Sequence, residues 1–181
     1  MNKKVLILSS SPRRNGNSDL LCDSFAKGAK EVGNSVEKIL LKDLNINYCT
    51  GCGLCNNNGY SGCSQKDDME SILDKMIDAD VIVMATPVYF YAMCGQMKTL
   101  IDRCCAKYTK IINKDFYFIL TAADGNKNAL NRTVEEFRGF LDCLSGANEK
   151  GIVYGTGVWQ KGEAANTNLP HEAYVLGKTV N

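Results

Sequence analysis

The sequence predicts an α/β protein built as a three-layer sandwich, with a five-stranded parallel sheet of order 2-1-3-4-5 between two layers of helices. Short apolar, β-branched runs alternate along the whole chain with stretches whose apolar residues recur at helical spacing. Each helix then carries the chain back to begin the next parallel strand. We expect one domain over residues 1–181, because this length suffices for one core and no stretch resembles a linker.

The first half of the chain predicts three strands and two helices. Four consecutive apolar residues at 5–8 suit a strand that is buried on both faces. A helix over 18–32 should end at Gly33 and Asn34, and residues 35–41 alternate well enough for a strand. Asp67 and Asp68 should open a helix through about residue 77, since acidic side chains favour a helix start. The most strand-like segment, 81–86, should stop at Pro87, which has no N–H to donate.

The second half continues the alternation. A helix is expected over 96–107, a strand over 116–121, a helix over 128–143, a strand over 148–154 and a short helix from about residue 170. Between the second strand and the second helix, residues 42–65 show no periodicity. This stretch contains the cysteine-rich loop at about residues 46–65.

The polar stretch from Ser9 to Ser18 joins the first strand to the first helix. Free N–H groups and the positive end of the helix dipole make such a junction an anion site, to which hydroxyl, amide and guanidinium groups add donors. The alternative is an ordinary capped turn, with Asn17 or Ser18 as N-cap. Neither G-x-x-x-x-G-K-[ST] nor G-x-G-x-x-G is present. A hydroxyl-rich loop with one glycine fits the phosphate of a mononucleotide flavin, FMN.

A second distinctive loop, from Pro87 to Gly95, follows the third strand. In the predicted strand order the first and third strands are neighbours, and ligands bind beyond the carboxyl ends of strands at such a point. Val88, Tyr89 and Phe90 could contact the faces of a flavin ring, and backbone N–H groups from 121–125 its polar edge. The alternative is that the three adjacent aromatic residues, Tyr89, Phe90 and Tyr91, belong to the core.

Four cysteines in the loop have the spacing C-x2-C-x2-C-x7-C: Cys49, Cys52, Cys55 and Cys63. Thiolates this close, with glycines between them, suit a [4Fe-4S] cluster. Zinc is an alternative metal, and free or disulfide-forming thiols are a further alternative. The remaining cysteines fall in or beside predicted helices and are interpreted as small buried residues: Cys22, Cys94, Cys104, Cys105 and Cys143.

Charge and hydropathy limit the classes of binding partner that the sequence favours. Twenty-one lysines and arginines balance twenty aspartates and glutamates, so the composition does not favour nucleic acid or an anionic membrane. No apolar stretch is long enough to span a bilayer. We therefore expect small-molecule partners, no nucleic acid, no membrane and a cytoplasmic location.

Several motifs together resemble the NADPH-dependent FMN reductase-like family of flavodoxin-like proteins. They include S-P-R-R-N-G-N-S at 11–18, T-P-V-Y at 86–89 and I-D-R at 101–103, and the cysteine spacing is similar to that of the iron-sulfur flavoprotein branch. The resemblance implies a homodimer or homotetramer in which Trp159 approaches the partner's flavin, or else serves as a packing anchor. It also implies FMN-binding residues: Ser9, Ser11, Arg13, Asn17, Ser18, Pro87, Val88, Tyr89, Phe90, Thr121, Ala122, Asp124 and Gly125.

The leading functional hypothesis is an FMN-dependent NAD(P)H oxidoreductase. Electrons would pass from a nicotinamide donor through FMN to a quinone, nitro compound, free flavin or another small acceptor, and no side chain is required as an acid or base. One alternative is an iron-sulfur flavoprotein that carries electrons with FMN and a [4Fe-4S] cluster, with a ferredoxin-like protein as partner. Another is a thiol or zinc redox sensor.

Overall fold

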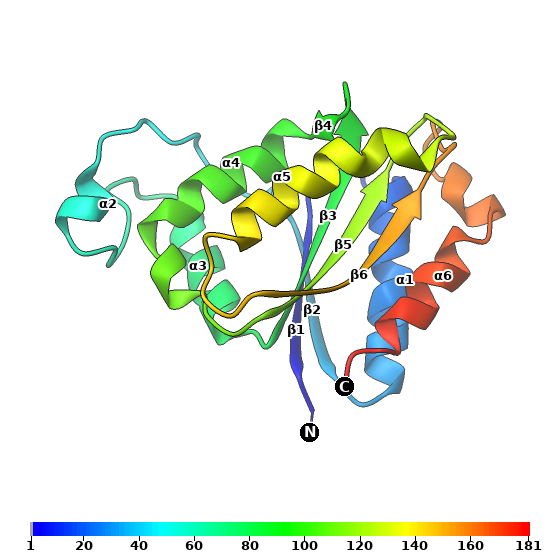
Figure 1. Ribbon diagram of the computed structural model, residues 1–181, viewed down its shortest axis with the longest axis horizontal. Coiled ribbons are helices and arrows are strands. Elements are labelled where there is room, and N and C mark those ends of the chain that lie inside the picture. The colour runs from blue at the N-terminus through cyan, green and yellow to red at the C-terminus, as the bar shows by residue number, and fades with distance from the viewer. Residues whose placement is uncertain (1) are drawn as a thin grey trace.

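A computed structural model, which describes residues 2–181, shows a parallel sheet of order β2-β1-β3-β5-β6, with a short strand β4 paired to β3 (Figure 1). The five parallel strands, counted along the chain, have the predicted order 2-1-3-4-5. The strands are β1 (Lys4–Ser9), β2 (Ser35–Leu40), β3 (Val81–Tyr89), β4 (Ala92–Met93), β5 (Asp115–Thr121) and β6 (Asn148–Gly155). The α-helices are α1 (Asn17–Glu31), α2 (Leu54–Asn57), α3 (Met69–Asp78), α4 (Gly95–Arg103), α5 (Asn131–Leu141) and α6 (Leu169–Gly177).

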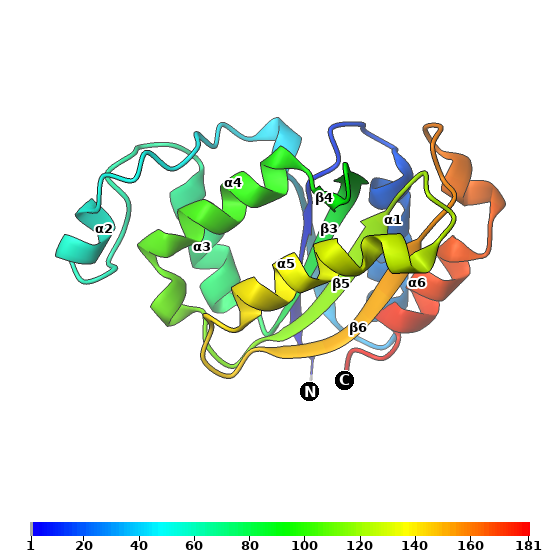
Figure 2. The same ribbon diagram turned by 45° about the horizontal axis from the view of Figure 1, so that its top comes forward.

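Helices cover both faces of the sheet, because successive side chains of a strand point to opposite sides. Val5 and Ile7 of β1 face α1 and α6, whereas Leu6 and Leu8 face α3, α4 and α5. Figures 1 and 2 show the sheet between these two helical layers. Among residues 2–181, no helix combines the length and the apolar character that crossing a bilayer requires.

The α1–α6 layer depends on two glycines. A Cβ at Gly28 would lie 2.1 Å from the backbone oxygen of Tyr174, and a Cβ at Gly177 would lie 2.2 Å from that of Phe25. No side chain fits either gap. The two helices can therefore approach each other closely enough to bury Phe25 against the sheet.

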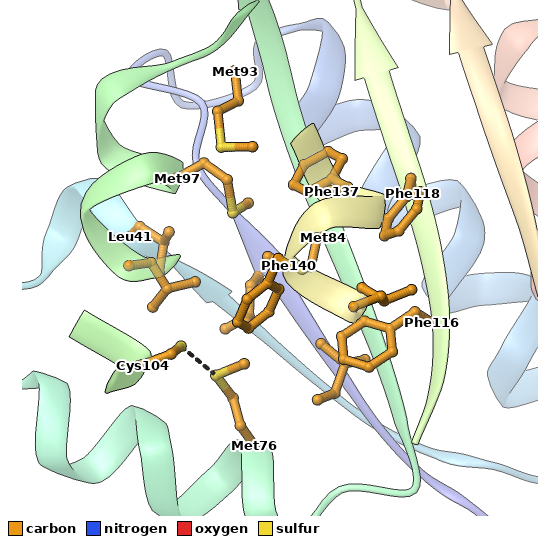
Figure 3. Packing of buried hydrophobic residues seen from close by; sticks show 14 of the residues in the cluster. Leu41, Met76, Met84, Met93, Met97, Cys104, Phe116, Phe118, Phe137 and Phe140 are labelled. Atoms are coloured by element: carbon orange, nitrogen blue, oxygen red, sulfur yellow. Dashed lines mark hydrogen bonds between the residues drawn. The ribbon is translucent and has the colours of Figure 1, made fainter. Parts of the chain in front are cut away.

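The opposite layer is rich in methionine and phenylalanine. Figure 3 shows Met76, Met84, Met93 and Met97 among the rings of Phe116, Phe118, Phe137 and Phe140. Phe118 and Phe137 stack with ring centroids 4.7 Å apart, and the Cys104 thiol lies 3.9 Å from the Met76 sulfur. Flexible thioethers fill the irregular gaps that rigid rings leave.

The prediction that Pro87 ends the third strand is wrong. β3 continues to Tyr89, and Pro87 is paired with Thr121 of β5. The extension exists because β4 folds back antiparallel, which pairs Val88 with Met93 and Tyr89 with Ala92. The Thr86 hydroxyl, which accepts from the Cys94 N–H at 3.1 Å, closes the base of this hairpin. Proline is tolerated here because it sits at the end of the parallel sheet.

Several other boundaries also differ from the predictions. The helix expected over 96–107 ends at Arg103 and is followed by two 3-10 turns, Cys104–Ala106 and Tyr108–Lys110. The aperiodic stretch contains the four-residue helix α2, which buries no residue. Gly16, and not Asn17 or Ser18, is the N-cap of α1. Cys105 and Cys143, which were expected to be buried, are exposed.

Candidate functional site

A cavity of about 410 Å³ opens beyond the carboxyl ends of β1, β3 and β5. It lies where the strand order reverses, between the loop after β1 and the hairpin after β3. Polar residues of the α1 start and aromatic residues of the hairpin after β3 both contribute to its lining. The lining residues are Ser11, Arg13, Gly16, Asn17, Ser18, Pro87, Val88, Tyr89, Phe90, Tyr91, Thr121, Ala122, Ala123, Asp124, Ala129, Leu130, Val158 and Trp159.

The polar part of the cavity lining comes from a tightly bonded loop. The Ser11 hydroxyl donates to the Arg13 carbonyl at 3.1 Å, and the Arg13 carbonyl also accepts from the Gly16 N–H at 3.0 Å. The Ser18 hydroxyl lies 2.7 Å from the hydroxyl of Thr121, which joins α1 to the end of β5. The loop thus presents hydroxyls and the start of a 15-residue helix to the cavity, an arrangement suited to an anion.

A buried carboxylate, that of Asp19, supports the conformation of this loop. This carboxylate accepts from the backbone N–H of Asn15 at 2.7 Å, which holds Asn15 at a positive φ of 55°. Lys38 of β2 contacts the same carboxylate at 2.7 Å. This ion pair offsets a negative charge that would otherwise oppose an anion at the helix start.

Two residues of the polar loop hold the segment after β6 in place. The Asn17 amide donates to the Gln160 carbonyl at 2.9 Å, and its oxygen accepts from the Ala164 N–H at 3.1 Å. The Arg13 guanidinium donates to the Trp159 carbonyl at 3.2 Å. Trp159 consequently lines the cavity of its own chain with its side chain 67% exposed, so it is not a buried packing anchor.

The aromatic part of the cavity lining comes from the hairpin between β3 and β4. Phe90 and Tyr91 form its turn at φ values of 52° and 64°, and Phe90 is fully exposed. Positive φ is costly for aromatic residues. Two adjacent aromatic residues at positive φ indicate that the rings exposed by this turn have a functional role. Tyr89, Phe90 and Tyr91 are therefore not core residues. The alternative interpretation, which placed these rings in the core, is wrong.

The structure brings most of the predicted cofactor residues together at this cavity. All of them line it except Ser9 and Gly125. Ser9 is fully buried, and its hydroxyl is one of two buried side-chain polar atoms without a hydrogen-bond partner in the described residues. Sequence reasoning missed Tyr91, Ala129, Leu130 and Val158, which reach the cavity only through the fold. The adjacency of Tyr91 to Tyr89 and Phe90 was the one available signal.

The four cysteines of the predicted cluster lie apart from this cavity, in the loop that contains α2 (Figure 2). Cys49 and Cys52 are exposed, whereas Cys55 and Cys63 are half-buried against the methionine-rich core. Within residues 2–181, no three His, Cys, Asp or Glu side chains are arranged to hold a metal ion. The backbone N–H of Leu54 lowers the pKa of the Cys52 thiol.

A buried ion pair anchors this loop to the core. Arg103, at the end of α4, donates to both carboxylate oxygens of Asp67 at 2.7 and 2.9 Å and to the Asn47 carbonyl at 2.6 Å. Both side chains are 1% exposed. The guanidinium and the backbone N–H groups of Asn47 and Met69 hold the pKa of the Asp67 carboxyl well below its usual range.

A fifth cysteine joins the loop in space. The Cys105 sulfur lies 3.6 Å from the Cys55 sulfur, although the two residues are 50 positions apart. Desolvation raises the pKa of the Cys105 thiol, and the nearby thiols of Cys55, Cys49 and Cys63 raise it further. The sequence provided no signal for this neighbour, because it follows a helix in a different part of the chain.

The fold is flavodoxin-like, and its cavity lies at the topological switch point of the sheet. Residues 3–154 match the family described as NADPH-dependent FMN reductase, and the chain belongs to this family. The resemblance seen in the sequence is thus confirmed.

Several curated relatives are named iron-sulfur flavoproteins. An iron-sulfur flavoprotein of Archaeoglobus fulgidus is 39% identical over 100 residues, which are 55% of this chain and 44% of that protein. The iron-sulfur flavoprotein MJ0731 of Methanocaldococcus jannaschii is 30% identical over 187 residues, covering 98% of this chain and 93% of that protein. The match with the first curated relatives spans about half of their length, between 44% and 51%.

Solved structures confirm the predicted fold. An NAD(P)H:quinone oxidoreductase from Methanothermobacter marburgensis superposes with a TM-score of 0.79 over 100% of this chain and 97% of that chain. Its sequence is 14% identical, so this likeness concerns the fold alone.

Proposed function

We propose that the cavity binds FMN and that the protein is an NAD(P)H-dependent oxidoreductase which reduces a small acceptor. The observation that carries this proposal is the composition of the cavity lining, which combines a helix start, hydroxyls and a guanidinium with exposed aromatic rings. FMN combines matching chemical groups, because it has a charged phosphate and a flat aromatic ring. Bound FMN would accept a hydride from the nicotinamide and pass electrons to the acceptor.

The residues of the chain would have distinct tasks. Ser11, Arg13 and Ser18 bind the phosphate, with the Asp19–Lys38 pair supporting the loop. Val88 and Tyr89 lie against one side of the ring, and Trp159 covers the mouth of the cavity. Ser9 and Gly125 do not line the cavity and therefore do not contact the cofactor in this arrangement.

Adjacent arginines supply a matched test. Arg13 lines the cavity, whereas Arg14 forms an ion pair with Asp43 at 2.7 Å and does not line it. We expect Arg13→Ala to weaken FMN binding about tenfold or more, because a hydrogen bond to a charged group contributes about 1.5–3 kcal/mol. Arg14→Ala should bind FMN like the wild type. Quenching of flavin fluorescence measures both dissociation constants.

The activity itself needs a separate measurement. Protein purified anaerobically and loaded with FMN should lose its flavin absorbance when NADPH or NADH is added and regain it with a quinone acceptor. Equal loss of flavin binding in both arginine variants would remove the site assignment. Flavin that binds tightly but is not reduced by either nicotinamide would instead refute the oxidoreductase activity.

A second candidate function is electron transfer with a [4Fe-4S] cluster held by Cys49, Cys52, Cys55 and Cys63. The names of the relatives and the anchoring of the loop by Arg103 and Asp67 favour it. Thiolates are the right donors for such a cluster. The four thiols are not gathered in the described residues, so the loop would have to rearrange to take up iron. Iron and acid-labile sulfide analysis of anaerobic protein, with Cys52→Ser as the variant, decides between the two functions.

The cellular setting is part of the proposal. A nicotinamide donor and free cysteines both suit a reducing compartment, so we place the protein in the cytoplasm. A homodimer or homotetramer and a ferredoxin-like partner remain predictions from the resemblance, and sedimentation would test the first.

A further inference from the structure

We propose that Cys55 and Cys105 form a reversible disulfide when the protein meets a peroxide, which fastens the cysteine loop to the end of α4. The inference is independent of FMN binding. It concerns a modification site composed of one cysteine from the predicted cluster and one cysteine outside it.

The distance between the sulfurs carries the proposal. They lie 3.6 Å apart, and within residues 2–181 no other two cysteines are in hydrogen-bonding contact. A disulfide needs a separation of about 2.05 Å, so the sulfurs must approach by about 1.5 Å. Cys55 lies on the short helix α2, which has no fully buried residue, although the Cys55 side chain is half-buried against the core. Closing the gap therefore requires a local shift of α2.

Contacts on both sides of the pair keep the loop in place. Arg103, two positions before Cys105, binds Asp67 and the Asn47 carbonyl. Tyr60 packs edge-on against Tyr108, with ring centroids 5.3 Å apart. The pair is therefore held between an ion pair and an aromatic contact, and its closeness does not depend on a chance position of a free loop.

Both thiols of the pair are accessible, which separates them from the buried cysteines of the core. Cys105 is exposed and Cys55 is half-buried, so a small oxidant can reach them. Cys22, Cys94 and Cys104 are buried in the core. Cys143 is exposed, but its thiol contacts the Gly139 carbonyl at 3.5 Å and no other cysteine. Cys49 and Cys52 are also exposed, but among residues 2–181 neither is in hydrogen-bonding contact with another cysteine.

The chemistry balances with hydrogen peroxide as the oxidant. One of the two sulfurs attacks a peroxide oxygen, the O–O bond breaks, and a sulfenic acid and one water are produced. The second sulfur then attacks the sulfenic sulfur, which forms the S–S bond and releases the second water. Both cysteines are oxidised and peroxide is reduced. A thiol reductant reverses the reaction.

The experiment is peptide mapping of the full-length protein, as purified and after removal of iron with a chelator. Both samples are treated with hydrogen peroxide, free thiols are alkylated, and the protein is digested without reductant. We expect a joined peptide that contains Cys55 and Cys105 in the iron-free sample, and its loss after treatment with dithiothreitol. Cys143→Ser should retain the joined peptide, and Cys105→Ser should lose it.

The peptide map of the wild-type protein tests the proposal even if a variant fails to fold. A disulfide between two cysteines of the loop, such as Cys49 and Cys52, with Cys105 free, would overturn the proposal. So would an iron-free sample whose Cys55 and Cys105 are both alkylated after peroxide. Neither result would bear on FMN binding, which fluorescence reports separately.

Discussion

Replacing Asp67 with asparagine should strongly destabilise the protein, although the side chain keeps its size. The carboxylate accepts two hydrogen bonds from Arg103, together with those from the backbone N–H groups of Asn47 and Met69 at 3.0 and 3.2 Å. Asp67→Asn leaves the guanidinium of Arg103 buried without a counter-charge. Loss of one partner of a buried pair costs about 3–5 kcal/mol. This is a large part of the total stability of a domain, about 5–15 kcal/mol.

Urea unfolding at neutral pH measures this cost. With a denaturant slope of about 1–3 kcal/mol per molar urea, the midpoint should fall by about 1 M or more. The control is Asp102→Asn, which removes an exposed ion pair with Lys98 one turn away on α4. That change should cost less than about 1 kcal/mol. Equal midpoints for the two variants would refute the reasoning that burial makes the Asp67 pair strong.

The same carboxylate predicts a pH dependence. Because folding holds the pKa of Asp67 below its usual value of 3.8, the ionised group stabilises the folded state at every pH above that value. The contribution disappears as the pH falls from 3.8 toward the lower folded-state pKa. The difference between the wild type and Asp67→Asn should therefore be constant between about pH 5 and 8 and shrink below about pH 4. A difference that grows in acid would contradict the assignment.

Four further substitutions, one of them a control, test the packing and the cavity. Gly28→Ala should lower the free energy of unfolding by about 1–3 kcal/mol, since its Cβ would meet the Tyr174 carbonyl. Gly139→Ala on α5 has open space and should raise it by about 0.5–1 kcal/mol. Thermal unfolding compares the two variants, and a Gly28→Ala variant as stable as the wild type would contradict the close approach of α1 and α6. Phe90→Gly should raise stability by about 1 kcal/mol by relieving positive φ, yet weaken FMN binding; unchanged binding would show that the ring does not contact the flavin. Asn17→Ala should speed hydrogen exchange in residues 158–164, which its amide holds, and unaltered exchange would refute that role.

The cysteine loop shows how a local pattern and a tertiary contact answer different questions. The spacing of four cysteines predicts a metal-binding loop from neighbours in the sequence alone. It contains no information about Cys105, which the turn after α4 brings to 3.6 Å from Cys55. It also gives no reason to expect the buried ion pair of Asp67, since an acidic residue before a helix already has a sufficient local explanation. Burial against Arg103 is the stronger reason, and only the fold shows it.

The strand order and the position of the site follow from the sequence by itself. Alternating apolar periods determine an α/β sheet, and the two unusual loops after the first and third strands mark the end of the sheet where the cavity opens. These features are local, so they can be read from consecutive residues. Five residues of the polar loop were predicted to bind the cofactor, and all of them except Ser9 line the cavity.

The tertiary structure alone determined the features that depend on contacts between residues far apart in the sequence. β4 pairs with β3 and carries the strand past Pro87, an extension that local proline chemistry argues against. Asn17 and Arg13 fix residues more than 140 positions away, and so place Trp159 at the mouth of its own cavity. Such contacts cost chain entropy that only the assembled sheet and helices offset, and for that reason no window of the sequence contains them.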